Sequence, residues 1–115
     1  MQELLSRATT GDHELFITVV NLGEVLYTTE NRRGLQAAQE ALAGIDQSPI
    51  QMVDVDRPLT LAAARLKAAT GVGYADCFVA ALAQHLGAAV VTGDPDFRQI
   101  EGVVSIEWLP GAEPL

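Results

Sequence analysis

The chain has 115 residues, 49% of them hydrophobic and 19% charged, with a net charge of −8. This length is that of one domain, and the composition excludes disordered and fibrous proteins. The negative charge argues against the basic surface of a general nucleic-acid binder, although a site built from carboxylates would itself be acidic. We expect a single domain over residues 1–115.

We expect neither a membrane span nor a signal peptide in this sequence. No apolar run approaches the roughly 18 residues of a membrane span, and the start at Met1–Glu3 has neither the basic nor the apolar region of a signal peptide. Cys77 is the single cysteine, so it cannot form an intramolecular disulfide, and its apolar surroundings predict a buried thiol. We therefore expect a cytoplasmic protein that does not bind a membrane.

The first half of the chain predicts short strands and amphipathic or apolar helices. Thr18 is a candidate N-cap for a helix whose apolar run is interrupted by Asn21 and Glu24. Asn21 is interpreted as a polar neighbour of Glu24. The predicted elements are a helical piece at 2–8, a strand at 15–17, a helix from 19 to a break at 31–34, a helix at 35–43, a loop at 44–49 and a strand at 51–55.

The second half contains the most informative stretch. Asp56 and Pro58 open a helix that ends at 71–73. A nearly all-apolar helix then begins at Tyr74 and stops at Gly87, with Tyr74 and Phe78 expected in the core. The remaining predicted elements are an interior strand at 88–92, a turn at 93–96, a short helical turn at 97–100, a strand at 104–108 and a frayed tail at 110–115.

Alternating strands and helices predict an α/β fold with a parallel sheet. In such a fold the helix N-termini and the carboxyl ends of the strands share one edge of the sheet. Asp76 lies in a helical first turn, Asp94 follows a strand, and Glu24 is about six residues, or about 9 Å, beyond Thr18. The three carboxylates are therefore expected to converge.

Converging carboxylates call for a cation. Two of them held about 4 Å apart repel by about 4 kcal/mol at an effective dielectric constant near 20. The two histidines, His13 and His85, show no paired ligand spacing, and an all-oxygen site favours Mg²⁺ or Mn²⁺ over zinc. Such an ion would activate water and neutralise charge that develops on a phosphodiester.

Each of these residues also has a structural interpretation. Asp76 can pair with the helix dipole, and Asp94 can cap the next helix or form an Asx turn. Asp96 fits a cap better than a ligand. Thr92 is either a β-branched strand residue or a hydrogen-bonding support of the site. Glu24, inside an apolar helix, is the hardest to explain without a function.

Three segments together resemble a PIN-domain ribonuclease of the VapC toxin type. They are Ile17–Tyr27, which is similar to the segment that carries the family's helical glutamate, the run from Tyr74 through Asp76 to Phe97, and Val104–Trp108. The resemblance covers residues 2–109. It implies a three-layer, Rossmann-like α/β fold with a mostly parallel sheet flanked by helices.

The same resemblance implies a function. It makes Asp76 and Asp94 ligands of Mg²⁺ or Mn²⁺, and it makes Glu24 a further metal-site residue that holds the water of the metal or acts as general base. Thr92 and Asp96 become accessory residues. It also implies RNA as substrate, a cognate antitoxin as partner, and a homodimer.

The sequence departs from the family at its start. The family begins with a central strand that ends in its first aspartate, and nothing before Gln2 supplies it. The strands at Leu15 and Ala89 should then border an empty slot, which would leave backbone groups unpaired. We expect either an incomplete PIN domain, with doubtful activity, or a second chain that fills the gap.

Three functions are consistent with this pattern. The first is a metal-dependent endoribonuclease, and the second is a catalytically silent PIN-like scaffold for an antitoxin-type partner. The third is a Mg²⁺-dependent phosphatase or receiver-like domain, which usually recruits a lysine after a late strand. Here the nearest cation, Arg98, follows a different motif.

Overall fold

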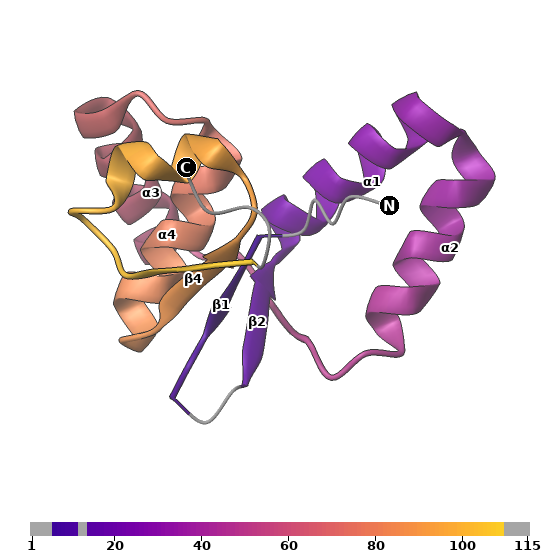
Figure 1. Cartoon of the computed structure of the whole chain (residues 1–115), viewed down its shortest axis with the longest axis horizontal. Helices are drawn as coiled ribbons and strands as arrows, with labels where there is room; N and C mark the ends of the chain where they lie inside the picture. The colour runs from indigo at the N-terminus through magenta and orange to yellow at the C-terminus, as the bar shows by residue number, and fades with distance from the viewer. Residues whose placement is uncertain (1–5, 12–13, 110–115) are drawn as a thin grey trace.

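The computed structural model describes residues 6–11 and 14–109, and in these residues it forms a five-stranded sheet with flanking helices (Figure 1). The elements are β1 (Arg7–Thr9), β2 (Leu15–Thr18), α1 (Val19–Arg33), α2 (Leu35–Asp46), β3 (Gln51–Val53), α3 (Arg57–Thr70), α4 (Tyr74–Leu86), β4 (Ala89–Thr92), the 3₁₀ helix η1 (Pro95–Ile100) and β5 (Ile106–Trp108).

The sheet is mixed, with strand order β3-β2-β1-β4-β5. Strand β1 pairs antiparallel with both β2 and β4, whereas β3 is parallel to β2 and β5 is parallel to β4. Four strands therefore run in one direction and β1 runs in the other. The α/β fold with a mostly parallel sheet is confirmed.

The central slot of the sheet is occupied by β1, which the sequence analysis did not predict. Ala8 lies opposite Phe16 of β2 and Val90 of β4. The helix predicted at 2–8 is wrong for Arg7 and Ala8, and residues 2–5 lie outside the described part. Local helix propensity is a weak preference, and pairing with two neighbouring strands satisfies the backbone on both sides. The slot that was expected to be empty is filled.

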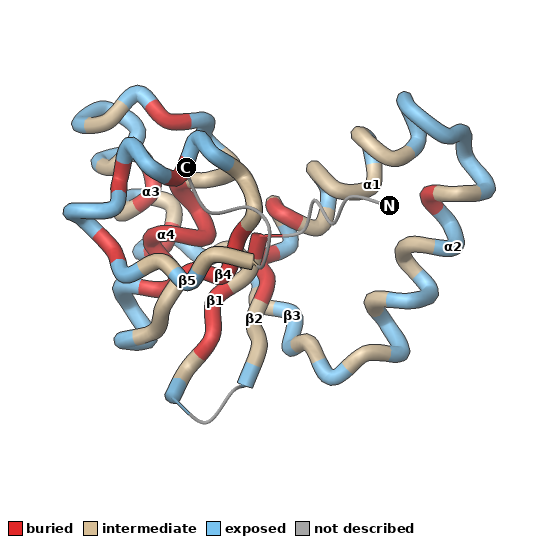
Figure 2. The backbone as a smooth tube through the Cα atoms, viewed as in Figure 1, coloured by how far each residue is buried: buried red, intermediate tan, exposed pale blue. Residues whose placement is uncertain are grey.

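The core lies between the sheet and α4. From Cys77 to Ala83 every side chain of α4 is buried, and this helix contacts β1, β2 and β4 (Figure 2). Helix α3 packs against α4 through the buried residues Leu59 and Ala63. The core prediction is wrong for Tyr74, which is 45% exposed and rests edge-on against Phe78. The buried part of α4 thus begins only after its first turn, and polar groups in that first turn can meet solvent.

Helices α1 and α2 form a hairpin that extends away from the sheet (Figure 1). Their buried residues are Asn21 and Ala38, so the apolar run of α1 is much less buried than the sequence predicts. The predicted break at 31–34 narrows to Gly34, whose φ of 94° suits glycine. The predicted loop at 44–49 is wrong for residues 44–46, because α2 continues to Asp46.

The predicted helix ends are largely confirmed. Thr18 and Asp56 accept backbone N–H groups of α1 and α3 as N-caps, and Gly87 ends α4 in the left-handed conformation. The tail predicted at 110–115 lies outside the described residues.

Among the described helices, none is long and apolar enough to cross a membrane by itself. The pair α3 and α4 passes by length and composition only when joined, and it is bent by 119° at the break.

The central position of β1 predicts that a charge at Ala8 is costly. Ala8 is 0% exposed, so Ala8→Asp buries a carboxylate without a partner and should lower the free energy of unfolding by about 3 kcal/mol. Ala64→Asp on the exposed face of α3 is the matched control and should change it by less than about 0.5 kcal/mol. Urea unfolding followed by circular dichroism measures both, and equal midpoints would place Ala8 outside the sheet.

Candidate functional site

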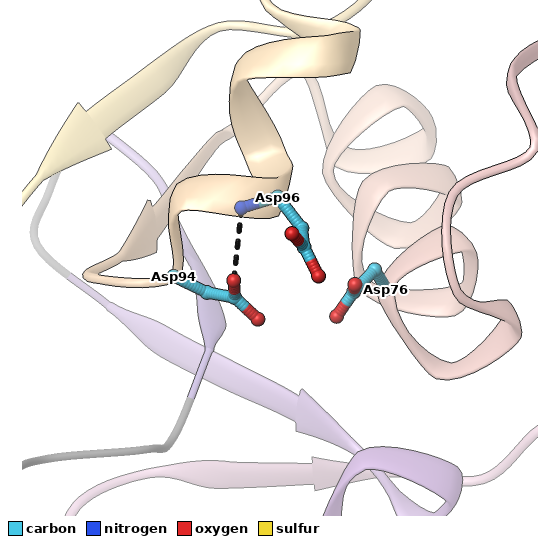
Figure 3. Close-up of side chains that lie close together, drawn as sticks. All are labelled: Asp76, Asp94 and Asp96. Atoms are coloured by element: carbon cyan, nitrogen blue, oxygen red, sulfur yellow. Dashed lines mark hydrogen bonds between the residues drawn. The ribbon is translucent and has the colours of Figure 1, made fainter. Parts of the chain in front are cut away.

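Three aspartates gather beside the N-terminal end of α4. Asp76 lies in the first turn of α4, and Asp94 and Asp96 lie at the start of η1 (Figure 3). Carboxylate oxygens of the three side chains all lie within 4.8 Å of one another. The structure therefore brings Asp76 and Asp94 together, as the sheet-edge argument predicts, and it adds Asp96.

The backbone around Asp94 is fixed on both sides. Its N–H donates to Thr92 Oγ1 at 3.0 Å, and its Oδ1 accepts from the N–H of Asp96 at 2.9 Å. Asp94 is thus the N-cap of η1, and the cap interpretation of Asp96 is wrong. Because the cap occupies Oδ1, the second oxygen of Asp94 remains available toward the other two carboxylates (Figure 3).

Asp76 is held by a buried helix and faces a glycine. The residues that follow it in α4 are in the core, which fixes its backbone. A Cβ added at Gly73 would lie 3.3 Å from Asp76 Oδ2, so glycine leaves room next to this carboxylate. The side chain of Asp76 can therefore turn toward Asp94 and Asp96.

Thr92 supports the site through the hydrogen bonds of its side-chain hydroxyl. It is 0% exposed, and its hydroxyl lies 2.9 Å from Ser6 Oγ in addition to accepting from Asp94. Ser6 precedes β1, and because β1 is antiparallel to β4, the start of β1 lies beside the end of β4. The sequence analysis missed Ser6, since residues 2–8 were predicted to be helical and nothing local indicates a strand.

Glu24 interacts electrostatically with Asp94 and Asp76 but does not belong to the group within 4.8 Å. Burial and the negative charge of Asp94 raise the pKa of Glu24. Glu24 in turn contributes to raising the pKa of Asp76. Its position is that of a neighbour whose charge is felt across the site, whereas Asp96 takes the place that the sequence analysis gave to Glu24.

Negative charge gathers at the site and acts most strongly on Asp76. Burial, together with the negative charges of Asp94, Glu24 and Asp96, raises the pKa of Asp76 to about 7. Every one of these effects disfavours the ionised form. A hard divalent cation would reverse the balance, and a set of carboxylate oxygens is what Mg²⁺ and Mn²⁺ bind. The donor set therefore fits such an ion.

Comparisons with known proteins give the chain its relatives. The family model of the PIN domain matches residues 2–103. No curated protein sequence matches the chain.

Several solved structures share the fold. A chain from DNA-bound VapBC of Salmonella typhimurium has 23% identity and a TM-score of 0.64, over 81% of this chain and 74% of that one. A chain from VapBC2 of Rickettsia felis, bound to a DNA fragment from their promoter, has 21% identity and a TM-score of 0.63, over 83% and 74%. A chain from a toxin-antitoxin complex of Klebsiella pneumoniae has 13% identity and a TM-score of 0.58, over 86% and 74%. At these identities the likeness concerns the fold.

The raised pKa of Asp76 predicts a pH-dependent gain for Asp76→Asn in metal-free protein. Because the folded pKa is about 7 and the unfolded value is near 3.8, the wild type loses stability as the pH rises from about 4 to 7. Asp76→Asn should therefore be more stable than wild type at pH 8, by about 2 kcal/mol after allowance for solvent screening, and nearly equal to it at about pH 4.

Urea unfolding in EDTA at the two pH values tests this expectation. Asp46→Asn, on the exposed surface of α2, is the control and should show no pH-dependent gain. A gain in stability for Asp76→Asn of the same size at both pH values would mean that folding does not raise the pKa of Asp76.

Proposed function

Because this chain belongs to the PIN domain family, whose model matches residues 2–103, we propose that it is a metal-dependent endoribonuclease of the VapC toxin type. The observation that carries the proposal is the group of Asp76, Asp94 and Asp96, whose carboxylate oxygens are close enough to share one ion. The fold similarity to chains of VapBC complexes supports the choice of the toxin branch.

The residues of the site divide the chemistry between them. Asp76, Asp94 and Asp96 would hold Mg²⁺ or Mn²⁺, and the ion, when bound, neutralises charge on the phosphodiester and lowers the pKa of water. Glu24 accepts the proton of the attacking water at its carboxylate, for which its raised pKa is suited. Thr92 keeps Asp94 in place through its hydroxyl.

The negative charge of the chain limits how it can bind RNA. With a net charge of −8, few cations are available to release counterions from phosphates, so binding away from the site should be weak. We propose that the divalent ion supplies the main attraction for the scissile phosphate.

A second function is favoured by the α1–α2 hairpin. This hairpin extends from the sheet with apolar residues at its surface, and Tyr27 and Leu35 are each more than half exposed. Exposed apolar surface of this kind marks protein interaction sites. The alternative is therefore a catalytically silent PIN-like scaffold for an antitoxin-type partner, and the same surface would also serve a homodimer.

RNA cleavage distinguishes the two functions. Wild type should cleave RNA with Mg²⁺ or Mn²⁺ and stop in EDTA, and Asp94→Asn and Glu24→Gln should each reduce the rate by about 100-fold. The control variant Asp46→Asn should keep the wild-type rate, because Asp46 lies on the exposed surface of α2. Gel separation of a defined RNA, labelled at one end, measures the rates.

The possible outcomes point in different directions. Equal cleavage by wild type and both site variants would reveal a contaminating nuclease and remove the enzymatic assignment. Absence of cleavage in every sample, with folded protein and Mn²⁺ present, would favour the scaffold.

A further inference from the structure

Asn21 is a buried polar residue whose role the proposed chemistry leaves open. Its side chain is 4% exposed, in the first turn of α1, one helical turn before Glu24. A buried amide is costly unless its hydrogen bonds are made. Both ends of the Asn21 amide have partners, and the two partners lie on different elements.

The first partner fixes which way the amide faces. Thr18 Oγ1 accepts the backbone N–H of Asn21 at 3.1 Å and donates its own proton to Asn21 Oδ1. With its oxygen facing Thr18, the amide directs Nδ2 the other way. The opposite orientation would place Oδ1 against another carbonyl oxygen, so the hydrogen-bond pattern supports one assignment.

The second partner is on α4. Asn21 Nδ2 donates to the carbonyl oxygen of Ala75 at 2.8 Å, and Ala75 directly precedes Asp76. One side chain therefore links the first turn of α1, one turn before Glu24, to the first turn of α4, which carries Asp76.

The position of α1 depends more on this hydrogen bond than the position of α4 does. The position of α4 is already set by seven consecutive buried residues, Cys77–Ala83, whereas α1 extends from the body with Asn21 as its buried residue (Figure 1). A tilt of α1 about its first turn would move Glu24 while leaving the aspartates in place. The hydrogen bond to Ala75 lies at the point that would have to move.

On this basis we propose that Asn21 is a positioning residue of the metal centre, which acts by holding Glu24 within reach of the site. The inference rests on the proposed function, because it assigns Asn21 a role in that same centre. Alanine or serine is too short to reach Ala75. Aspartate would place an oxygen against the Ala75 carbonyl and add a further negative charge. Asparagine meets both requirements, since it accepts on one side and donates on the other.

A double-mutant cycle on Mn²⁺ affinity tests the proposal. Asn21→Ala should weaken Mn²⁺ binding by about 10-fold, the effect expected when a supporting hydrogen bond is removed. In a Glu24→Gln background the same change should cost less than about 2-fold, because the residue through which Asn21 acts is no longer a carboxylate. Isothermal titration calorimetry on the full chain, at a temperature where all variants are folded, measures the four dissociation constants.

The control separates positioning from general loss of stability. Leu26→Ala truncates a half-buried side chain on the same helix without touching the link to Ala75, and it should keep the wild-type affinity within about 2-fold. A cost of Asn21→Ala that persists in the Glu24→Gln background would overturn the inference. If the wild type binds Mn²⁺ and Asn21→Ala binds it equally well, the inference on Asn21 is overturned, but the proposed function is not. A wild type that binds no Mn²⁺ would overturn the proposed function as well.

Discussion

Mutual repulsion among Asp76, Asp94 and Asp96 is the constraint on which the site depends. One oxygen of each lies within 4.8 Å of the others, and burial adds to the cost of the negative charge on Asp76. Side chains free to move would separate. They remain close because the backbone of each segment is fixed by other interactions, namely the buried face of α4 and the cap of η1. The folding energy of the core therefore maintains an arrangement that is unfavourable by itself.

The sheet supplies the second part of this support. Strand β1 joins β2 to β4, and so it holds together the two halves from which Glu24 and the aspartates come. Because β1 is antiparallel, its start lies at the edge where the site lies, and Ser6 hydrogen-bonds to Thr92 there. A strand of three residues thus closes the sheet and also buttresses the residue that holds Asp94.

Much of the fold and part of the site could be predicted from the sequence. Helix α4 was predictable because a nearly uninterrupted apolar run that ends in glycine is typical of a buried helix. The proximity of Asp76 and Asp94 followed from topology, since helix starts and strand ends meet at one edge. These predictions depend on long segments or on general rules of chain connection.

The rest depended on tertiary context. Three residues such as Arg7–Thr9 carry no periodicity, so the strand they form is decided by its two neighbours. Asp96 belongs to the closest group instead of Glu24, and the Asp94 cap that fixes the backbone of Asp96 depends on the folded turn. The burial of Asn21, and the only partial burial of most apolar residues around it, likewise depend on how the α1–α2 hairpin leaves the sheet.

The most direct test of the account is the position of a bound ion. Crystals of the protein soaked in Mn²⁺ should give an anomalous difference peak within about 2.3 Å of oxygens from Asp76 and Asp94, with Asp96 completing the contacts and Glu24 in the next shell. A peak elsewhere, or none at this position with Mn²⁺ at millimolar concentration, would contradict the claim that these carboxylates form a metal centre.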